Sequence, residues 1–482
     1  MSRLVVGPFN RVEGDLEVKL EMSDGHVARA EVVSPLYRGF EQMLQGKDPR
    51  DGLVIAPRIC GICSVSQSVA AAAALAGAQG LEPAPNGQLV TNIVHAAENI
   101  ADHLTHFYLF FIPDFTREVY GSEPWHAATA ERFTALRGSA VRQMLPQRAE
   151  FMHIVGTLAG KWPHTLSLQP GGVTKWVAAN EVQRLLGLLA GFRRFLEQTA
   201  IGVALEQFAD LRSRDELFAL LESCGPTQSD LFQFLKISEA LRLNRLGRAQ
   251  DRYLSYGAYR QTSGHLFARG LRDGDVRQQL NTGLIAEDVS NAWMLGPDTA
   301  LHPFDGVTEP DGHMTSGYTW CKAPRLAGHA AEVGALARQV VDGHPLAMDL
   351  VAEGSNVEAR IVARFLEVAI LVPEMVRWLR EIRPADAFIA HGETPNDAEG
   401  AGLVEAARGS LGHWLKVSGG KISNYQIIAP TTWNFSPRDA AGQPGALEAA
   451  LVGAPVRNGE TEPVAVQHIV RSFDPCMVCT VH

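Results

Sequence analysis

The sequence is poor in cysteine, in positive charge and in long apolar runs. Only 6 of its 482 residues are cysteine, which excludes the disulfide framework of a small secreted domain and indicates a reducing, cytoplasmic setting. Acidic residues outnumber basic ones by 53 to 43, so the charge needed for broad non-specific nucleic-acid binding is missing. No run of about 18 apolar residues predicts a membrane span, and the first residues lack the apolar segment of a signal peptide.

The periodicity predicts an α+β protein that is mainly α, with a smaller N-terminal β portion. Leu16, Val18, Leu20 and Met22 alternate with polar residues, as in a half-buried strand. Residues 27–33 supply the return strand after a Ser23-Asp24-Gly25 turn. Alanine content or apolar spacing predicts helices, and glycine and proline predict a loop over 296–315. The predicted helices span residues 64–78, 88–111, 177–206 and 361–382.

Four of the cysteines form two C-x-x-C pairs near opposite ends of the chain. Cys60 and Cys63 form the first pair, and Cys476 and Cys479 form the second. Two such pairs can give one four-thiolate metal site. If they do, both ends belong to one folding unit, so we expect a single domain over 1–482. Its parts would be an N-terminal sheet (about 1–45), a helical core (about 64–420) and a C-terminal metal-binding segment (about 421–482).

The spacing of the pairs leaves the metal open. A structural zinc site is the commonest use of four cysteines, but zinc ribbons usually keep their pairs within about 15–20 residues, and here nearly the whole chain separates them. A dithiol redox pair would need a strand–C-x-x-C–helix context, which is not evident. Thiolates also bind nickel, copper(I) and iron.

The residues around the cysteines resemble the two metal-binding signatures of nickel–iron hydrogenase large subunits. These are Arg58-Ile59-Cys60-Gly61-Ile62-Cys63 and Asp474-Pro475-Cys476-Met477-Val478-Cys479-Thr480-Val481-His482. Other segments match family motifs in the same order: Arg11-Val12-Glu13-Gly14, Tyr37-Arg38-Gly39-Phe40-Glu41, Ala101-Asp102-His103-Leu104-Thr105-His106-Phe107-Tyr108, Lys322-Ala323-Pro324-Arg325, Glu405-Ala406-Ala407-Arg408-Gly409, Asn424-Tyr425-Gln426 and Thr431-Thr432-Trp433-Asn434. The resemblance implies the large helical-bundle core of that family and heterolytic cleavage of H2.

The resemblance also implies roles for the cysteines and for one glutamate. All four paired cysteines would bind nickel, and Cys63 and Cys479 would bridge to an iron that carries one carbon monoxide and two cyanide ligands. Cys479 would accept the first proton. Glu13 matches the proton-relay glutamate of the family, and a relay must reach its proton by hydrogen bond or through one water. We therefore expect Glu13 beside Cys479.

Further residues match the surroundings of that centre. Arg408 corresponds to the arginine over the open metal position, where its charge is fixed at working pH. Asp102 and Asp474 correspond to the carboxylates around it. Ala407 stands where the family commonly has proline.

A magnesium site is also implied, at Glu41, the carbonyl of Ile427 and His482, because hard oxygen ligands suit magnesium. The remaining cysteines, Cys224 and Cys321, are too few to hold an iron–sulfur cluster. The iron–sulfur clusters would therefore belong to a partner small subunit. The sequence assigns no role to these two cysteines.

Several departures from the common pattern resemble the regulatory, hydrogen-sensing branch of the family. Gln67 stands where C-x-x-C-x-x-x-H has histidine, so a titratable group is replaced by an amide. Ile62 and Phe110 replace smaller Val and Leu in the gas channel, and the sequence ends at His482 without the usual extension. We expect a slow, oxygen-insensitive enzyme that signals to a histidine kinase and forms a dimer of heterodimers. The alternative is an uptake hydrogenase, and a remote alternative is a non-enzymatic zinc-bound structural protein.

Overall fold

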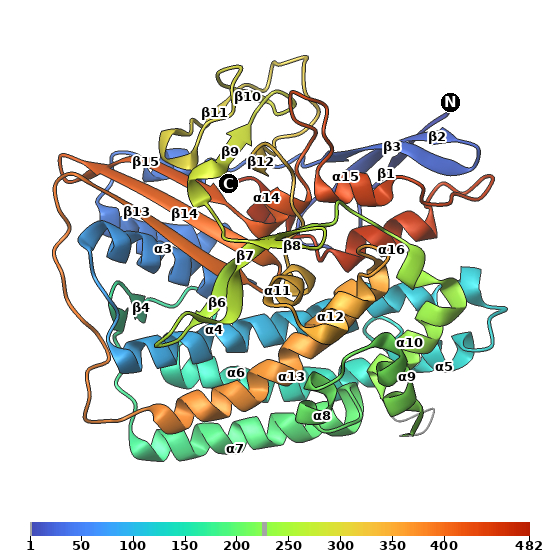
Figure 1. Ribbon diagram of the computed structural model, residues 1–482, viewed down its shortest axis with the longest axis horizontal. Helices are drawn as coiled ribbons and strands as arrows, with labels where there is room; N and C mark the ends of the chain where they lie inside the picture. Colours follow the sequence, from blue (N-terminus) through green and yellow to red (C-terminus); the bar gives the residue numbers. More distant parts are fainter. Residues whose placement is uncertain (1, 224–228) are drawn as a thin grey trace.

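Four long helices lie side by side in the lower half of the molecule in Figure 1. They are α4 (Pro85–Thr105), α6 (Ser139–Ala159), α7 (Ala179–Phe195) and α13 (Val357–Glu381). Proline at the first position of α4 and the Asn356 side chain, which accepts a hydrogen bond from the Ala359 N–H, start two of them. The computed structural model describes residues 2–223 and 229–482, and Cys224 therefore lies outside the described residues.

Shorter helices surround this layer. Their bounds are α1 Phe40–Leu44, α2 Gly52–Ile55, α3 Ser64–Gln79, α5 His126–Phe133, α8 Leu205–Ala209, α9 Arg214–Ser223, α10 Asp230–Leu241, α11 Ala335–Asp342, α12 Pro345–Leu350, α14 Pro430–Asn434, α15 Ala446–Leu451, α16 Val464–Ser472 and α17 Met477–Thr480. No helix in the described part of the chain is long and apolar enough to cross a membrane.

Antiparallel strands form three three-stranded sheets and three two-stranded pairs within the described residues. The sheets are β1–β2–β3 (Ser2–Val6, Glu17–Ser23, His26–Val33), β6–β7–β8 (Arg252–Arg260, His265–Asp273, Val276–Gln278) and β13–β14–β15 (Ala398–Ala406, Gly409–Ser418, Lys421–Ile428). The pairs are β4 (Leu168–Gln169) with β5 (Gly172–Val173), β9 (Ile285–Asp288) with β12 (Ala323–Leu326), and β10 (Met294–Leu295) with β11 (Glu309–Pro310).

The helix α3, which follows the first cysteine pair, packs directly on strand β13 (Figure 1). The two backbones approach so closely that a Cβ atom on Gly402 would lie 1.9 Å from the Ala70 carbonyl oxygen, and one on Gly400 would lie 2.0 Å from that of Ala74. Alanines on α3 and glycines on β13 therefore set the height of the cysteine helix above the sheet.

The α+β class is confirmed, but strands are not confined to the N-terminal part. The sheets at 252–278 and 398–428 lie mostly inside the range expected to be helical, and residues of β6 and β14 are nearly all buried. Strands buried on both faces lack the alternation by which the N-terminal strands were predicted. The N-terminal strands and the helices at 64–78 and 361–382 agree with the structure within a few residues.

Two predicted helices end earlier than expected. The helix predicted over 88–111 changes after Thr105 to a π-helical turn over His106–Phe111. The helix predicted over 177–206 ends at Phe195, passes through a π-helical turn and breaks at Gly202, whose φ is 92°. Apolar spacing continues through both turns, so it could not show the change in winding.

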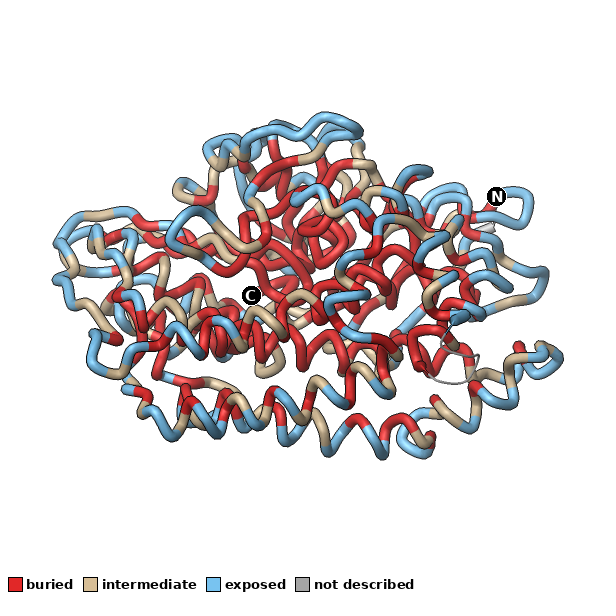
Figure 2. Tube along the Cα trace, turned by 60° about the horizontal axis from the view of Figure 1, so that its bottom comes forward, coloured by how far each residue is buried: buried red, intermediate tan, exposed pale blue. Residues whose placement is uncertain are grey.

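The segment around Glu13 meets the C-terminal segment in the interior. Glu13 and Cys476 form a parallel β-bridge, and the Met477 N–H donates to the Glu13 carbonyl at 2.7 Å. Figure 2 shows the C-terminus surrounded by buried chain, and His482 is 5% exposed. One apolar cluster joins the N-terminal sheet, the long helices and α16. This packing brings the two cysteine pairs together.

Candidate metal centre

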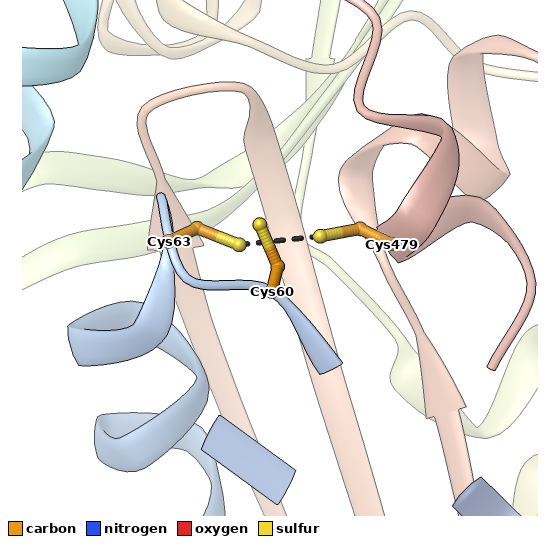
Figure 3. A group of neighbouring side chains, drawn as sticks. All are labelled: Cys60, Cys63 and Cys479. Atoms are coloured by element: carbon orange, nitrogen blue, oxygen red, sulfur yellow. Dashed lines mark hydrogen bonds between the residues drawn. The ribbon is translucent and has the colours of Figure 1, made fainter. Parts of the chain in front are cut away.

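The four paired cysteines converge on one buried point. Cys60 lies in the turn before α3, Cys63 is the N-cap of α3, and Cys476 and Cys479 flank and enter α17. The sulfur–sulfur distances are 3.5 Å for Cys60–Cys476, 3.2 Å for Cys63–Cys479 and 3.1 Å for Cys476–Cys479. Figure 3 shows three of these side chains pointing toward one another, and none of the four forms a disulfide.

This donor set fits a thiolate-bound metal. With metal–sulfur bonds of about 2.3 Å, four sulfurs in a tetrahedron lie roughly 3.8 Å apart, so small side-chain rotations would open the cluster around an ion. Soft thiolates suit nickel and iron. The Arg38 guanidinium donates to the carbonyls of Ile59 and Val478, the residues before Cys60 and Cys479. One side chain thus ties the two cysteine loops together.

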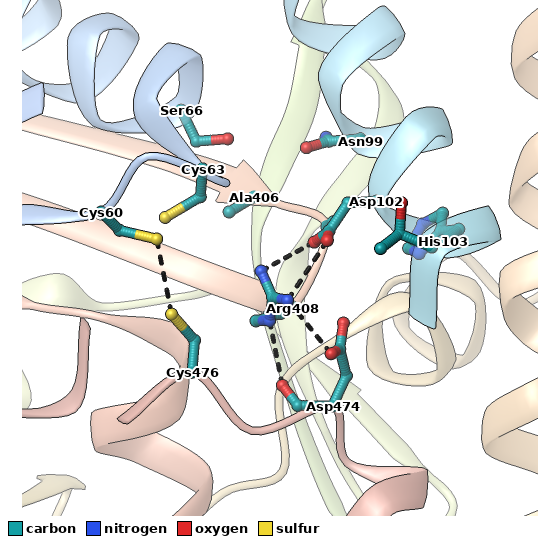
Figure 4. Close-up of polar contacts among 12 residues, drawn as sticks. Cys60, Cys63, Ser66, Asn99, Asp102, His103, Ala406, Arg408, Asp474 and Cys476 are labelled. Atoms are coloured by element: carbon teal, nitrogen blue, oxygen red, sulfur yellow. Dashed lines mark hydrogen bonds and ion pairs between the residues drawn. The ribbon is translucent and has the colours of Figure 1, made fainter. Parts of the chain in front are cut away.

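Arg408 lies between two buried carboxylates beside the cysteines (Figure 4). Its guanidinium is 2.8 Å from Asp102 and 3.1 Å from Asp474, and its Nε–H donates to the Asp474 carbonyl at 3.0 Å. Burial raises the pKa of Asp102 to about 8 despite the guanidinium. Burial also opposes ionisation of Asp474, but Arg408 and other nearby cations lower its pKa. Burial opposes the charge of Arg408, but Asp102 and Asp474 raise its pKa well above the ordinary value, so the arginine stays charged.

The turn that carries Arg408 is held by a second buried arginine. Arg338, from α11, donates to the carbonyls of Ala406 and Ala407 at 2.8 and 3.2 Å. It is itself paired with Glu367 and Glu405, each at 2.8 Å. Arg338 therefore fixes the hairpin between β13 and β14. Sequence motifs gave no sign of Arg338, because its partners lie 29 or more positions away.

Glu13 is attached to the C-terminal cysteine segment through its backbone. Its N–H donates to the Pro475 carbonyl at 3.4 Å, which sets it beside Cys476. Burial and the charge of Cys60 raise the pKa of its half-buried carboxyl, while Arg408 and Arg38 act in the opposite direction. The structure gives the Glu13 carboxylate no hydrogen bond to Cys479 among the described residues, so its place in a relay stays a prediction.

The three residues predicted to bind magnesium lie together next to the backbone of Cys479. The His482 ring approaches the Ile427 carbonyl at 2.6 Å and Glu41 at 3.6 Å, and it also contacts the Cys479 carbonyl at 3.0 Å. They line a cavity of about 20 Å³, room for about one ion or water. Although burial opposes ionisation, Lys322 and His482 lower the pKa of Glu41 to about 2. An ionised carboxylate, a carbonyl and an imidazole thus face one small space.

Gln67 is fully buried and belongs to a polar chain behind Cys63. Its Oε1 lies 2.8 Å from the His413 ring, whose other nitrogen lies 2.8 Å from the Tyr425 hydroxyl. Burial lowers the pKa of His413 to about 3, so the ring is neutral. The Gln67 amide nitrogen has no hydrogen-bond partner in the described part of the chain. His413 was not predicted, because nothing in its local sequence points to position 67.

The remaining predicted positions have simpler surroundings. Ile62 packs against the cysteine cluster and is half-buried, and Phe110 is half-buried in the π-helical turn after α4. Their role in a gas channel stays a prediction. Cys321 is buried, and its thiol donates to the carbonyl of Lys322 at 3.1 Å, well away from the paired cysteines in sequence.

Comparison with known proteins agrees with this arrangement. The profile described as nickel-dependent hydrogenase matches residues 38–132 and 115–482. The chain is 28% identical to the periplasmic NiFeSe hydrogenase large subunit of Desulfomicrobium baculatum and 28% identical to the uptake hydrogenase large subunit of Afipia carboxidovorans. Each alignment covers 100% of this chain and 95% of the relative.

Solved structures give the same result. The H2-activated, anaerobically purified NiFeSe hydrogenase of Dm. baculatum matches with a TM-score of 0.85 at 28% identity. The Ni-Fe-Se hydrogenase from D. vulgaris Hildenborough in the reduced state matches with a TM-score of 0.84 at 29% identity, and both matches cover 100% of each chain. Because the profile spans nearly the whole chain and the cysteine cluster fits its metal, this protein belongs to the nickel-dependent hydrogenase family, among the large subunits.

Proposed function

We propose that this chain is the catalytic large subunit of a nickel–iron hydrogenase and that Cys60, Cys63, Cys476 and Cys479 hold its metals. The observation that carries the proposal is the cluster of four buried sulfurs, with neighbouring sulfurs 3.1–3.5 Å apart, beside the paired guanidinium of Arg408. When bound, a nickel–iron centre with one carbon monoxide and two cyanide ligands on iron supplies the site at which hydrogen is split. Cys63 and Cys479 are the two cysteines proposed to contact both metals.

The protein side chains then handle charge and protons. The thiolate of Cys479 is the proposed first proton acceptor, and Glu13 is the proposed next carrier, since its backbone is bonded to the same segment. Its raised pKa brings its proton affinity closer to neutral pH. Arg408 contributes a fixed positive charge next to the centre, oriented by Asp102 and Asp474.

A magnesium ion is proposed at Glu41, Ile427 and His482. It would replace the close contact between the His482 ring and the Ile427 carbonyl and would link the last residue to α1 and β15. Electrons would leave through iron–sulfur clusters of a partner small subunit, since this chain has only two further cysteines. H2 is the substrate, and no nucleic acid is involved.

We favour a regulatory role in which the state of the centre is reported to a histidine kinase. Support comes from the neutral Gln67–His413 pair behind Cys63 and from the bulkier Ile62 and Phe110. The proposal includes a cytoplasmic location, slow turnover, oxygen insensitivity and a dimer of heterodimers.

An energy-conserving uptake hydrogenase is the second candidate. The relatives that favour it are named uptake hydrogenase large subunits in Afipia carboxidovorans and Rubrivivax gelatinosus, each 28% identical over 100% of this chain. The same cysteine cluster would serve either role, so the site geometry does not separate them.

Activity in air separates the two candidates. A sensor should reduce dyes slowly with hydrogen, keep that activity after exposure to air, and be required for induction of other hydrogenases in a deletion strain. The same assays are made on the Gln67→His variant, which restores the histidine of the common C-x-x-C-x-x-x-H motif. Fast dye reduction that collapses in air, with normal induction in the deletion strain, would reject the sensor and leave the uptake enzyme.

A further inference from the structure

A buried carboxylate outside the predicted site holds the start of the cysteine helix. Glu98, on α4, is 2% exposed. Its two oxygens accept hydrogen bonds from the backbone N–H groups of Val65 and Ser66, each at 2.8 Å. These amides belong to the first turn of α3, where N–H groups have no partner within the helix. Glu98 therefore caps α3 from a neighbouring helix.

Side-chain donors supply further hydrogen bonds to the same carboxylate. The Ser66 hydroxyl donates at 3.0 Å and the Trp162 indole N–H donates at 2.9 Å. The Ser64 hydroxyl approaches at 3.5 Å and accepts the His164 N–H at 3.2 Å. The segment after α6 thus closes over the cysteine turn while Glu98 supports it from α4. Such a convergence of donors on one buried carboxylate fixes both partners.

The cap stands in for one that α3 lacks. The N-cap residue is Cys63, whose side chain makes no capping hydrogen bond, and Ser, Thr, Asp or Asn usually serve there. A sulfur committed to a metal is not free to cap. Glu98, 35 positions after Cys63, caps the helix instead. It can reach α3 only because α4 packs against α3.

The charge of Glu98 also bears on Cys63. The start of a helix carries partial positive charge, which draws electron density from a thiolate placed there. A carboxylate seated on the same N–H groups offsets that charge when it is ionised. Burial raises the pKa of Glu98 to about 7, against the hydrogen bonds from Val65, Ser66 and Trp162, so the offset is complete only above neutral pH. Glu98 and Asp102 are four positions apart on α4, so they share one face, and Asp102 contacts Arg408 at 2.8 Å. Figure 4 shows Ser66 of α3 facing the turn of α4 that carries Asn99 and Asp102.

We propose that Glu98 is a positioning residue of the metal centre. By capping α3 it fixes the position of Cys63 relative to Arg408. Its charge also offsets the partial positive charge that the helix start places on the Cys63 thiolate. The inference rests on the proposed role of Cys63 as a metal ligand. Two variants of the loaded heterodimer separate the geometric and electrostatic parts. Glu98→Gln keeps the length of the side chain and removes its charge, and Glu98→Asp keeps the charge and shortens the side chain.

The measurements are amide hydrogen exchange in the peptide spanning 60–67 and the infrared carbonyl band of the centre, the latter recorded at about pH 9, where the Glu98 carboxyl is ionised. Loss of the cap should speed exchange at residues 65 and 66 about tenfold in both variants. The carbonyl band should move to higher wavenumber in Glu98→Gln, because less electron density reaches the metals, and should stay near wild type in Glu98→Asp. The control is Glu181→Gln, since Glu181 accepts the Ala178 N–H at the start of α7, far from the cysteines in sequence.

The outcomes are separable. Unchanged exchange at 65 and 66 in either variant would overturn the cap, and faster exchange with an unmoved band in Glu98→Gln would overturn the electrostatic role. If Glu98→Gln does not accumulate as loaded protein, exchange in Glu98→Asp decides the cap. If wild-type protein holds no nickel, the proposed function fails, while the exchange comparison still tests the cap.

Discussion

At the scale of single residues, buried carboxylates in this chain differ in ionisation because their partners differ. Burial opposes the ionised form in each. Lys322 and His482 outweigh it at Glu41, whose pKa falls to about 2. At Glu448 burial dominates and raises the pKa to about 7. Glu41 is therefore ionised at neutral pH, whereas Glu448, which joins α15 to strand β3, is only about half ionised there.

The Glu448 carboxyl predicts a pH dependence of stability. Its Oε1 accepts the Tyr318 hydroxyl at 2.7 Å and the Val32 N–H at 3.1 Å, and Arg438 lies 4.0 Å from the other oxygen, with Glu31 also nearby. Because the folded pKa lies above the ordinary 4.5, the stabilisation is present below about pH 4.5 and is lost as the pH rises through about 7. The loss is at most about 3 kcal/mol.

Glu448→Gln keeps an oxygen for both donors and cannot ionise. We expect its melting temperature to exceed that of wild type at pH 9 and to equal it near pH 5. The measurement is thermal unfolding of both proteins at the two pH values. A constant difference between them across this range would contradict the assignment.

At the scale of elements, the packing of α3 on β13 determines where the first cysteine pair lies. The contact depends on residues with no side chain, because Gly400 and Gly402 face backbone atoms of α3 at distances that no Cβ can occupy. The Arg408 hairpin, between β13 and β14, belongs to the same sheet. The sheet that contains β13 and β14 thus positions both the helix α3 and Arg408.

Gly402→Ala tests this packing. A methyl group 1.9 Å from the Ala70 carbonyl forces α3 away from the sheet, and we expect a loss of about 1–3 kcal/mol of stability together with reduced nickel content. The matched control is Gly156→Ala on α6, where nothing lies within 4 Å of the added methyl and helix propensity predicts a gain of about 0.5–1 kcal/mol. A Gly402→Ala protein with normal melting temperature and full nickel would disprove the role of the contact.

Local patterns predicted the features whose signals lie close together in the sequence. The two C-x-x-C pairs, the alternation at 16–22 and the long helices α4, α7 and α13 are of this kind, whereas α6 at 139–159 was not predicted. Glu98, Arg338 and His413 were missed, because each acts on a residue that is near only after folding. Glu98 had one sequence signal, its place four positions before Asp102. Strand β14 was missed because burial on both faces removes alternation.

At the scale of the whole molecule, the fold joins segments from opposite ends of the sequence in its interior. The bridge between Glu13 and Cys476 and the burial of His482 make the C-terminal segment part of the interior. The single domain proposed for 1–482 follows from the need to join Cys60 and Cys63 to Cys476 and Cys479. One apolar cluster joins the long helices to the N-terminal sheet and to strands β6 and β7, and a second joins α3 to strands β14 and β15 around the four cysteines.

Infrared spectroscopy of the purified heterodimer tests the central claim most directly. If the four cysteines hold a nickel–iron centre that splits hydrogen, the spectrum contains one carbonyl band and two cyanide bands, which shift when hydrogen is admitted. Their persistence after air would also favour the sensing role over uptake. A folded protein whose four-cysteine site is fully occupied by zinc, with no carbonyl or cyanide bands, would contradict the account.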